Sequence, residues 1–337
     1  MKTSHLIKYI AGAAVIFFLL GLWYIKKDTV TVSDSRLTLG TIVEITLIGK
    51  DKQVLNDALT AAFARITEIE KITDRFTAGS EISAINRRKS PDAIPVSPDM
   101  LRMLTISRNV SDITGGAFDV TVAPLVDLWG FDVGGRLPKP EEIERTRALV
   151  DYHRVKIDEN SATISLTDSS TRLDLGGIAQ GYAAGEIEKI LRDRGITGGV
   201  VNISGDIIVI GDKMGKPWRI GVQDPRNTNK LYAVINAKDI AIVTSGDYER
   251  CFFVDGLRYH HILDPKTGYP ARGCASVTVV TRDVELADAL STAIFILGPE
   301  EGVKLVDSLK GVEVLITTED GKRISTPGLS EIVEFVD

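Results

Sequence analysis

Two oxygen-bearing side chains are spaced to share one face of an apolar helix near the C-terminal end of the sequence. In the segment ELADALSTAIFILG, residues 285–298, Asp288 and Thr292 are four positions apart, which places them one helical turn from each other. A carboxylate and a hydroxyl in apolar surroundings are costly to bury without a partner, and a hard cation such as Mg²⁺ accepts such oxygen ligands. The alternative is a helix whose early Asp simply favours the positive end of the helix dipole.

A glycine-rich turn, DLGGIAQG at residues 174–181, joins a predicted strand to a predicted helix. Turns of this type bring backbone N–H and carbonyl groups close to phosphates or ions. The segment lacks both the Gly-Lys-Ser/Thr of a Walker loop and the spacing of a dinucleotide-binding loop. It therefore predicts either a turn that faces an ion or phosphate, or a tight structural turn.

Aromatic rings stand beside carboxylates in GGAFDVTVAPLVDLWGF, residues 115–131. Phe118 followed by Asp119 suits contact with a planar heterocycle, whose edge the acid could hydrogen-bond. Aromatic residues of this kind also pack in protein cores. Both interpretations remain open from this segment.

Two adjacent histidines, His260 and His261, occur in YHHILDPKTGYP, residues 259–270. Adjacent residues on a strand point to opposite faces, so one imidazole could face a cleft while the other faces solvent. Imidazole is well suited to proton transfer near neutral pH. A solvated hairpin is the alternative.

Predicted helices position these segments along the chain. Apolar residues three and four apart predict a helix over residues 51–73. Another follows Pro98, a residue suited to a first helical turn. The glycine-rich turn leads into a helix that closes at Gly195. Further helices are expected at residues 284–297 and near 300–309.

Strands make up much of the remainder. Residues 36–49 alternate apolar and polar side chains and predict one strand after a polar linker, and short strands are expected within residues 153–173 and from 199 to about 281. The strands and helices follow no regular βαβ alternation, and no internal repeat is present. The sequence therefore predicts an α+β fold, with a single catalytic domain of mixed sheets and helices over residues 36–337.

The overall composition excludes some classes of protein. The 337 residues are 44% hydrophobic and 26% charged, as in globular proteins. A net charge of -6 argues against nucleic acid as the main partner, because phosphate binding needs a basic face. The two cysteines, Cys251 and Cys274, have no metal-ligand spacing, and the sequence leaves open whether they form a disulfide or stay as buried thiols.

The N-terminal segment, residues 1–35, has a different character from the rest. Residues 9–25 are uncharged and mostly apolar, with lysines on both sides and Trp23 and Tyr24 near the end of the stretch. Such a stretch is about 25 Å long as a helix, just enough to cross the hydrocarbon core of a bilayer. The interfacial aromatics and the absence of a small-residue cleavage site favour an uncleaved membrane anchor over a cleaved signal. The flanking charges do not fix its orientation.

Taken in order, these segments resemble the motifs of the ApbE-like flavin transferase family. The resemblance covers the chain from about Leu37 to its C-terminus and rests on LGTIVEITL, DRFTAGSEISAIN, GAFDVTVAPLVDLWGF, DLGGIAQGYA, VNISGDI, TSGDYER, HILDPKTGYP and ELADALSTA. It implies a bacterial, Mg²⁺-dependent FAD:protein FMN transferase. Such an enzyme moves the FMN half of FAD onto a Thr or Ser hydroxyl of an acceptor protein and releases AMP.

The resemblance also implies roles for individual residues. In the family an Asp, the residue one helical turn later and a backbone carbonyl of the glycine-rich turn bind the metal, which corresponds to Asp288, Thr292 and Gly177. The histidine of the motif corresponds to His261, which we expect to be the general base, whereas His260 lies just outside the motif. Contacts with FAD correspond to Leu39, Phe76, Ala117, Phe118, Asp119, Asp174, Gln180 and Leu263.

The sequence departs from the family pattern at three positions. Leu39 replaces a methionine of similar size, a change that cores tolerate. Gln180 stands where many members have Lys, which removes a positive charge from the nucleotide neighbourhood. Gly185 stands where many members have Asp, and the sequence offers no reason for it.

The resemblance further implies a location and partners. The catalytic domain is expected on the periplasmic face of the bacterial inner membrane, with the anchor's N-terminus in the cytoplasm and a membrane electron-transfer subunit as acceptor. Two other functions stay open. The same metal and base could pass FMN to water, as in an FAD pyrophosphatase, or the chain could bind flavin without turnover.

Overall fold

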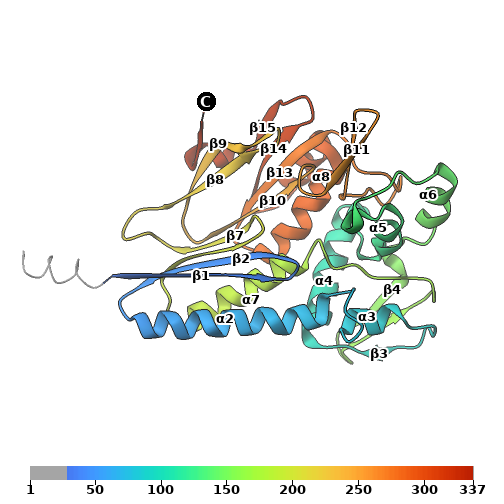
Figure 1. Cartoon of the computed structure of the whole chain (residues 1–337), viewed down its shortest axis with the longest axis horizontal. Coiled ribbons are helices and arrows are strands. Elements are labelled where there is room, and N and C mark those ends of the chain that lie inside the picture. The colour runs from blue at the N-terminus through green and yellow to red at the C-terminus, as the bar shows by residue number, and fades with distance from the viewer. Residues whose placement is uncertain (1–28, 337) are drawn as a thin grey trace, which may run out of the picture.

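The computed structural model describes residues 29–336, and Figure 1 shows them as a layered assembly of sheets and helices. The helices are α2 (Lys52–Thr73), α3 (Glu81–Asn86), α4 (Pro98–Ile113), α5 (Ala123–Trp129), α6 (Pro140–Arg147), α7 (Ala179–Asp193) and α8 (Val284–Ser308). Short 3₁₀ turns are η1 (Val120–Val122), η2 (Phe131–Val133), η3 (Tyr152–Arg154) and η4 (Pro327–Glu331).

The strands form one large antiparallel sheet and three small ones. The large sheet has the order β1 (Val30–Thr38), β2 (Thr41–Gly49), β6 (Gly198–Ile203), β7 (Asp206–Gly211), β10 (Ile240–Gly246), β13 (Cys274–Thr281), β14 (Val312–Thr318) and β15 (Arg323–Ser325). The small sheets are β16 (Val333–Phe335), β9 (Asn227–Ala237) and β8 (Trp218–Asp224); β3 (Ile94–Pro95), β5 (Thr163–Leu166) and β4 (Val155–Asp158); and β11 (Cys251–Val254) with β12 (Leu257–His260).

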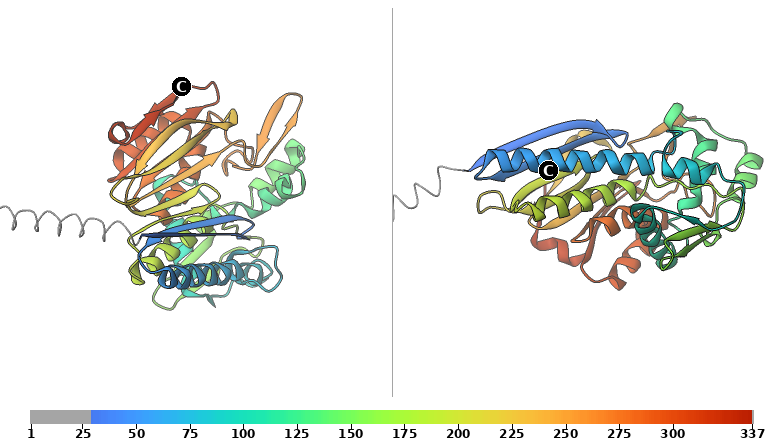
Figure 2. Two further views of the ribbon diagram at one scale, coloured as in Figure 1. Left: turned by 60° about the vertical axis from the view of Figure 1, so that its left-hand side comes forward. Right: turned by 90° about the horizontal axis from the view of Figure 1, so that it is seen from below.

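Each face of the large sheet buries its own apolar layer. Alternate residues such as Ile208 and Val279 pack against α2, α4, α7 and α8 on one face, while Val209 and Val280 pack under the β16–β9–β8 sheet on the other. Figure 2 shows the helices lying together along one side of the sheet. Because β13 lies between the two layers, all of its residues are buried. The expected α+β fold with mixed sheets and helices is thus confirmed.

Ion pairs join neighbouring helices of this layer. Arg65 of α2 contacts Asp99 of α4 and Glu186 of α7, with a 2.8 Å contact to Glu186. Glu285 of α8 pairs with Arg102 of α4 and with Lys189 of α7, each at 3.0 Å. The Arg65, Asp99, Glu186 and Glu285 side chains are largely buried, whereas Arg102 and Lys189 are exposed. The pairs of Arg65 therefore fix how α2, α4 and α7 sit against one another more than exposed pairs would.

Most of the predicted elements are present. The helices expected over residues 51–73, after Pro98 and after the glycine-rich turn correspond to α2, α4 and α7, and Gly195 closes α7 with a φ of 75°. The two helices expected after residue 284 are the two halves of α8. They meet at a kink where Gly298 has a φ of 81° and Pro299 interrupts the helix.

Two predictions about the N-terminal part were wrong in detail. Residues 30–35, assigned to a linker, form the first half of β1, which pairs with β2 over its whole length. Residues 36–49, read as one strand, contain the turn between β1 and β2 at Leu39 and Gly40, which both have positive φ. Exposed edge strands carry few apolar residues, which is why β1 resembled a polar linker.

The predicted membrane anchor lies within residues 1–28, outside the described part of the chain. Between residues 29 and 336, none of the helices is both long enough and apolar enough to span a bilayer. Cys251 and Cys274 are both free thiols, and Cys274 is buried.

Helices α7 and α8 approach each other closely at two glycines of α7. A Cβ atom on Gly181 would lie 2.5 Å from the Cβ atom of Asp288 and 2.7 Å from the carbonyl oxygen of Val284. A Cβ atom on Gly185 would lie 3.0 Å from Cγ of Glu285. Only glycine fits without displacement, and an Asp at position 185 would also meet the Glu285 carboxylate. This contact accounts for the departure at Gly185.

Replacing Gly181 with alanine tests this close approach. We expect overpacking against α8 to cost about 3 kcal/mol. Alanine is more favourable than glycine in a helix by about 1 kcal/mol, so the free energy of unfolding should fall by about 2 kcal/mol. Urea denaturation measures the free energy of unfolding. The matched control is Gly79→Ala, since no atom lies within 4 Å of a Cβ there; it should change stability by less than about 0.5 kcal/mol. Equal stability of Gly181→Ala and wild type would contradict the packing argument.

Candidate active site

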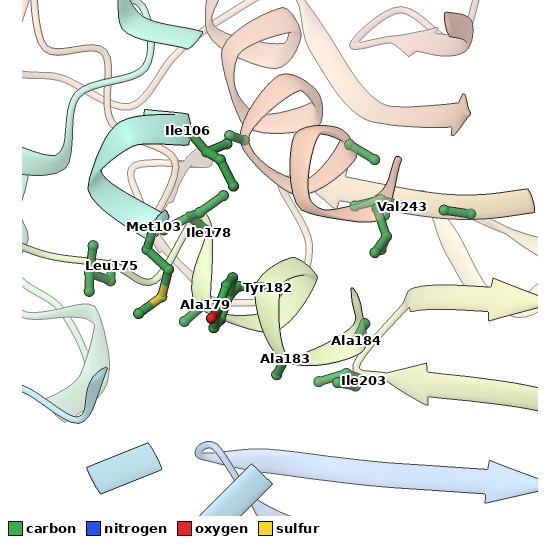
Figure 3. Close-up of a cluster of buried hydrophobic side chains, with 14 of the residues drawn as sticks. Met103, Ile106, Leu175, Ile178, Ala179, Tyr182, Ala183, Ala184, Ile203 and Val243 are labelled. Carbon is green, nitrogen blue, oxygen red and sulfur yellow. The ribbon is translucent and has the colours of Figure 1, made fainter. Parts of the chain in front are cut away.

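The glycine-rich turn, α8 and the loop before η1 meet at the N-terminal end of α7. A Cβ atom on Gly177 would lie 3.6 Å from Oγ1 of Thr292 and 3.0 Å from Cε2 of Phe118. Gly177 therefore touches both the α8 face that carries Asp288 and the ring of Phe118. Figure 3 shows Leu175, Ile178 and Ala179 at the start of α7 packed beside Met103 and Ile106 of α4. The structure thus brings together residues predicted for the metal and for the flavin.

Asp288 caps α7 from a different helix. Helix α7 begins without a side-chain cap of its own, so its first N–H groups need other acceptors. Oδ2 of Asp288 accepts a hydrogen bond of 2.8 Å from the N–H of Gly181. The positive end of the α7 dipole favours a carboxylate at this place, although burial raises the pKa of Asp288 above its usual value. The hydrogen bond uses one carboxylate oxygen and leaves the other available.

Thr292 lies one turn after Asp288, beside β10. Its hydroxyl is 3.4 Å from Oγ of Ser245, which is also 2.8 Å from Oγ of Ser291. Asp288 and Thr292 project from the same face of α8, as predicted. Together with the Gly177 carbonyl they form a set of oxygen donors of the kind that Mg²⁺ prefers. The donor chemistry therefore fits a hard divalent cation.

This donor set differs from the common clusters of metal-binding side chains. Within residues 29–336, no group of three or more His, Cys, Asp or Glu side chains could hold a metal ion. A site built here has to combine carboxylate oxygen with hydroxyl and backbone carbonyl oxygen. Such mixed oxygen sets suit Mg²⁺ or Ca²⁺ better than Zn²⁺.

Asp174, at the start of the glycine-rich turn, is tied to the segment that carries Phe76. Its Oδ1 accepts the N–H of Gly176 at 2.7 Å, and its Oδ2 lies 2.8 Å from Nε of Arg75. Arg75 also contacts Asp127 at 2.6 Å and stacks over the ring of Phe76 at 4.4 Å. Arg75 was missed from the sequence, because nothing local reveals a partner about a hundred residues away.

Phe76 stands at the edge of an open pocket. Its side chain is 70% exposed, which is unusual for phenylalanine and suits contact with a ligand. The pocket has a volume of about 320 Å³. It is lined by Arg75, Phe76, Ala78, Ser83, Asn86, Arg87, Ala123, Asp127 and Arg172.

Asp119 and Ala117 shape the loop before η1. Both carboxylate oxygens of Asp119 are used within the chain: Oδ1 accepts the N–H of Thr121 at 2.7 Å, and Oδ2 accepts the N–H of Tyr152 at 2.9 Å. Burial raises the pKa of Asp119. Ala117 and Phe118 are buried beside it. The Asp119 carboxylate therefore holds the loop that presents the Phe118 ring to Gly177.

Three other predicted residues lie at the borders of this region. Leu39 occupies the β1–β2 turn, where its N–H donates to Oε1 of Glu70 at 2.7 Å. Gln180 is half-buried in the first turn of α7. Leu263 is buried with Leu125 and Trp129 in a separate apolar cluster. No hydrogen bond or ion pair among the described residues joins these three to Asp288.

The two histidines differ in their surroundings. His260, the last residue of β12, is buried, with its Nε2 atom 2.9 Å from the carbonyl oxygen of Ala271 and its ring packed edge-on against Phe295 of α8. His261 follows the strand, so the expectation that both histidines lie on the strand was wrong. Its N–H donates to the carbonyl of Arg250 at 3.0 Å, while its Nδ1 atom is buried and has no hydrogen-bond partner among the described residues.

Both imidazoles are neutral at neutral pH. Burial lowers the pKa of His260 to about 4, and burial together with the charge of Arg250 lowers the pKa of His261 to about 3. His261 therefore keeps an unprotonated ring nitrogen that can accept a proton. Among the described residues no hydrogen bond joins His261 to Asp288 or Thr292; the connection to α8 runs through His260 and Phe295.

Comparison with known proteins decides the family. The ApbE family profile matches residues 39–316 of the chain. The chain belongs to the ApbE family. Its curated relatives include the FAD:protein FMN transferase of Vibrio cholerae, 32% identical with 88% of this chain and 90% of the relative covered, and that of Haemophilus influenzae, 31% identical with 93% and 94% covered.

Solved structures of the family share this fold. The ApbE protein of Thermotoga maritima matches with a TM-score of 0.82 and 35% identity, over 90% of this chain and 99% of that one. The flavin transferase ApbE of Vibrio cholerae matches with a TM-score of 0.81 and 31% identity over the same shares. A form of the Vibrio cholerae protein with a histidine replaced by glycine also matches, with a TM-score of 0.80.

The buried His260 should make the fold sensitive to acid. The folded chain keeps His260 neutral down to about pH 4, whereas an unfolded histidine takes up a proton below about pH 6.5. Its contribution to stability is therefore complete above pH 6.5 and is lost as the pH falls towards 4. When the pH falls from 7 to 5, protonation of this histidine in the unfolded state should lower the free energy of unfolding by about 2 kcal/mol.

Urea denaturation of His260→Gln at the two pH values measures this loss. The variant keeps a donor for the Ala271 carbonyl and should lose about 2 kcal/mol less than wild type between pH 7 and pH 5. An equal loss in wild type and His260→Gln would contradict the assignment.

Proposed function

We propose that this chain is a Mg²⁺-dependent FAD:protein FMN transferase. It moves the FMN half of FAD onto a Thr or Ser hydroxyl of an acceptor protein and releases AMP. The observation that carries the proposal is the meeting of Gly177, Asp288 and Thr292 with the Phe118 ring at the start of α7. The curated relatives that carry the name FAD:protein FMN transferase, at about 30% identity over most of the chain, support the same activity.

The reaction is a phosphoryl-type transfer with balanced bonds. The acceptor hydroxyl oxygen forms a bond to the phosphorus on the FMN side of the pyrophosphate, the bond between that phosphorus and the bridging oxygen breaks, and AMP leaves. Positioning and charge neutralisation dominate such transfers. Mg²⁺, when bound, supplies the neutralisation of pyrophosphate charge.

The residues of the chain provide the remaining functions. Asp288, Thr292 and the Gly177 carbonyl would hold the cation, and Phe118 and Phe76 offer rings to the planar parts of FAD. Asp174 keeps Arg75 and the Phe76 segment against the glycine-rich turn. Leu39, Ala117, Asp119, Gln180 and Leu263 complete the proposed cofactor contacts. His261, whose imidazole is neutral at neutral pH, accepts the proton of the acceptor hydroxyl.

The experiment that tests this function distinguishes its products. The full chain is incubated with FAD, Mg²⁺ and an acceptor protein that carries an exposed Thr/Ser flavinylation motif. We expect flavin fluorescence on the acceptor in a denaturing gel, together with AMP. Free FMN plus AMP without labelled acceptor would indicate an FAD pyrophosphatase instead, and unchanged FAD would indicate a flavin-binding module.

Two variants in the same assay connect the activity to the site. Asp288→Asn should lower the rate by about 100-fold or more, because a cation site loses its charged ligand. His261→Ala should lower it by about 100-fold at neutral pH, as general bases contribute on that order. Exposed Asp255→Asn serves as the control and should keep wild-type activity. Full activity of either site variant would remove that residue from the mechanism.

We also propose that the catalytic domain lies on the periplasmic face of the inner membrane, with a membrane electron-transfer subunit as acceptor. The support is the apolar stretch at residues 9–25 with flanking lysines. Alkaline phosphatase, which is active only outside the cytoplasm, is fused after residue 29. We expect an active, membrane-bound fusion and an inactive one when residues 9–25 are deleted. An inactive full fusion would contradict this orientation.

A further inference from the structure

Asp206 places a carboxylate on the helix-covered face of the large sheet. It is the first residue of β7 and pairs with Ile203 across the β6–β7 turn. Alternate residues of a strand share a face, so Asp206 faces the same side as Ile208. Ile208 belongs to the apolar layer under the helices, together with Ile203. The Asp206 side chain therefore lies on the face of the sheet that α7 and α8 cover. Figure 3 shows Ile203, its partner across the turn, near Ala184 of α7.

This carboxylate is buried without a partner. Asp206 is 5% exposed, and its Oδ2 atom has no hydrogen-bond partner among the described residues. An isolated carboxylate in such surroundings is costly, so proteins normally pair it or bind a metal with it. The Ser204–Gly205 turn, where both residues have positive φ, delivers Asp206 to this position. A buried carboxylate oxygen without a partner is a feature that needs an explanation.

The other buried acids of the described chain all have partners. Asp247 accepts contacts of 2.7 and 2.6 Å from Arg226 and Arg258. Glu285 pairs with two cations from α4 and α7, and Asp119 accepts backbone N–H groups. Asp206 differs from them because its Oδ2 atom has no partner among the described residues, and the strand that carries it contacts both α7 and α8. Burial and the negative charge of Asp288 both raise the pKa of Asp206.

Asp206 and Asp288 are both buried between the sheet and the helices, and a buried carboxylate without a full set of partners needs a nearby positive charge or a proton. Arg102 and Lys189 of the helix layer are already paired with Glu285. Asp288 meanwhile uses one oxygen for the Gly181 N–H. A divalent cation would contact the remaining oxygen atoms of both carboxylates, whereas apolar side chains around them would leave these oxygen atoms without a partner.

We propose that Asp206 supplies a second carboxylate to the cation site of Asp288, Thr292 and Gly177, so that two negative charges balance one divalent cation. The inference rests on the proposed function, which provides the Mg²⁺ requirement, and adds a residue to which the family resemblance assigned no role. Asp206 belongs to the VNISGDI motif. Its position links β7 to the site, which otherwise draws on the glycine-rich turn and α8.

The proposal predicts opposite effects on metal binding and on metal-free stability. In the full chain, Asp206→Asn should weaken Mg²⁺ binding by about 10- to 100-fold, the range for residues that support a metal site. Without metal the same variant should melt at a higher temperature than wild type, because it replaces a buried carboxylate that has no partner with a neutral side chain of similar size. Calorimetric titration with Mg²⁺ and melting curves with and without Mg²⁺ measure the two effects.

Controls separate this role from a structural one. Asp255→Asn removes an exposed charge in the β11–β12 turn, at a residue with a φ of 50° that asparagine tolerates; it should keep wild-type Mg²⁺ affinity and melting temperature. Asp206→Ser provides a second neutral variant should Asp206→Asn not fold, with the same expected directions. A purely structural role would lower the melting temperature of both variants without metal and leave Mg²⁺ affinity unchanged.

The outcomes distinguish this inference from the proposed function. If wild type binds Mg²⁺ and Asp206→Asn binds it with the same affinity, the role of Asp206 is overturned and the transferase proposal stays intact. Absence of Mg²⁺ binding in wild type, both alone and with FAD, overturns the metal requirement and with it the role of Asp206. Weakened binding with raised metal-free stability supports both.

Discussion

The close approach of α7 and α8 is the constraint on which the rest of the site depends. Gly181 leaves no room for a side chain, and the resulting contact lets Oδ2 of Asp288 accept the Gly181 N–H at 2.8 Å. A buried carboxylate thereby caps the N-terminus of a helix from another element. The same contact brings Thr292 beside the glycine-rich turn. Moving the two helices apart would break this cap and would also separate the oxygen donors from one another.

Other parts of the molecule hold this contact in place. Glu285, one turn before Asp288, is paired with Arg102 and Lys189, so α4, α7 and α8 are joined beside the site. On the opposite side, Arg75 connects Asp174 to the exposed ring of Phe76. Precise positioning of ligands by a packed surrounding layer is what phosphoryl transfer requires. The large sheet provides the rigid support beneath, because β10 and β13 contact α8 directly.

Much of this arrangement follows from local sequence patterns. The periodicity of apolar residues located α2, and the glycine-rich turn with Gly195 located α7. The spacing of Asp288 and Thr292 placed them correctly on one face of a helix. The edge strand β1 was missed, because its exposed residues carry little apolar signal. The ion pair of Arg75 with Asp174 and the burial of Asp206 beneath the helices depend on tertiary contacts between distant segments. Gly185 had no explanation until its contact with Glu285 was seen.

The central claim is that the turn before α7 and the buried face of α8 together form one cation site. Crystals of the full chain grown with FAD and Mn²⁺ in place of Mg²⁺ test it directly, since anomalous scattering locates manganese. The account predicts a single strong peak in contact with oxygen atoms of Asp288, Thr292 and Gly177. A peak elsewhere in the molecule, or FAD bound with no peak at these residues, would contradict it.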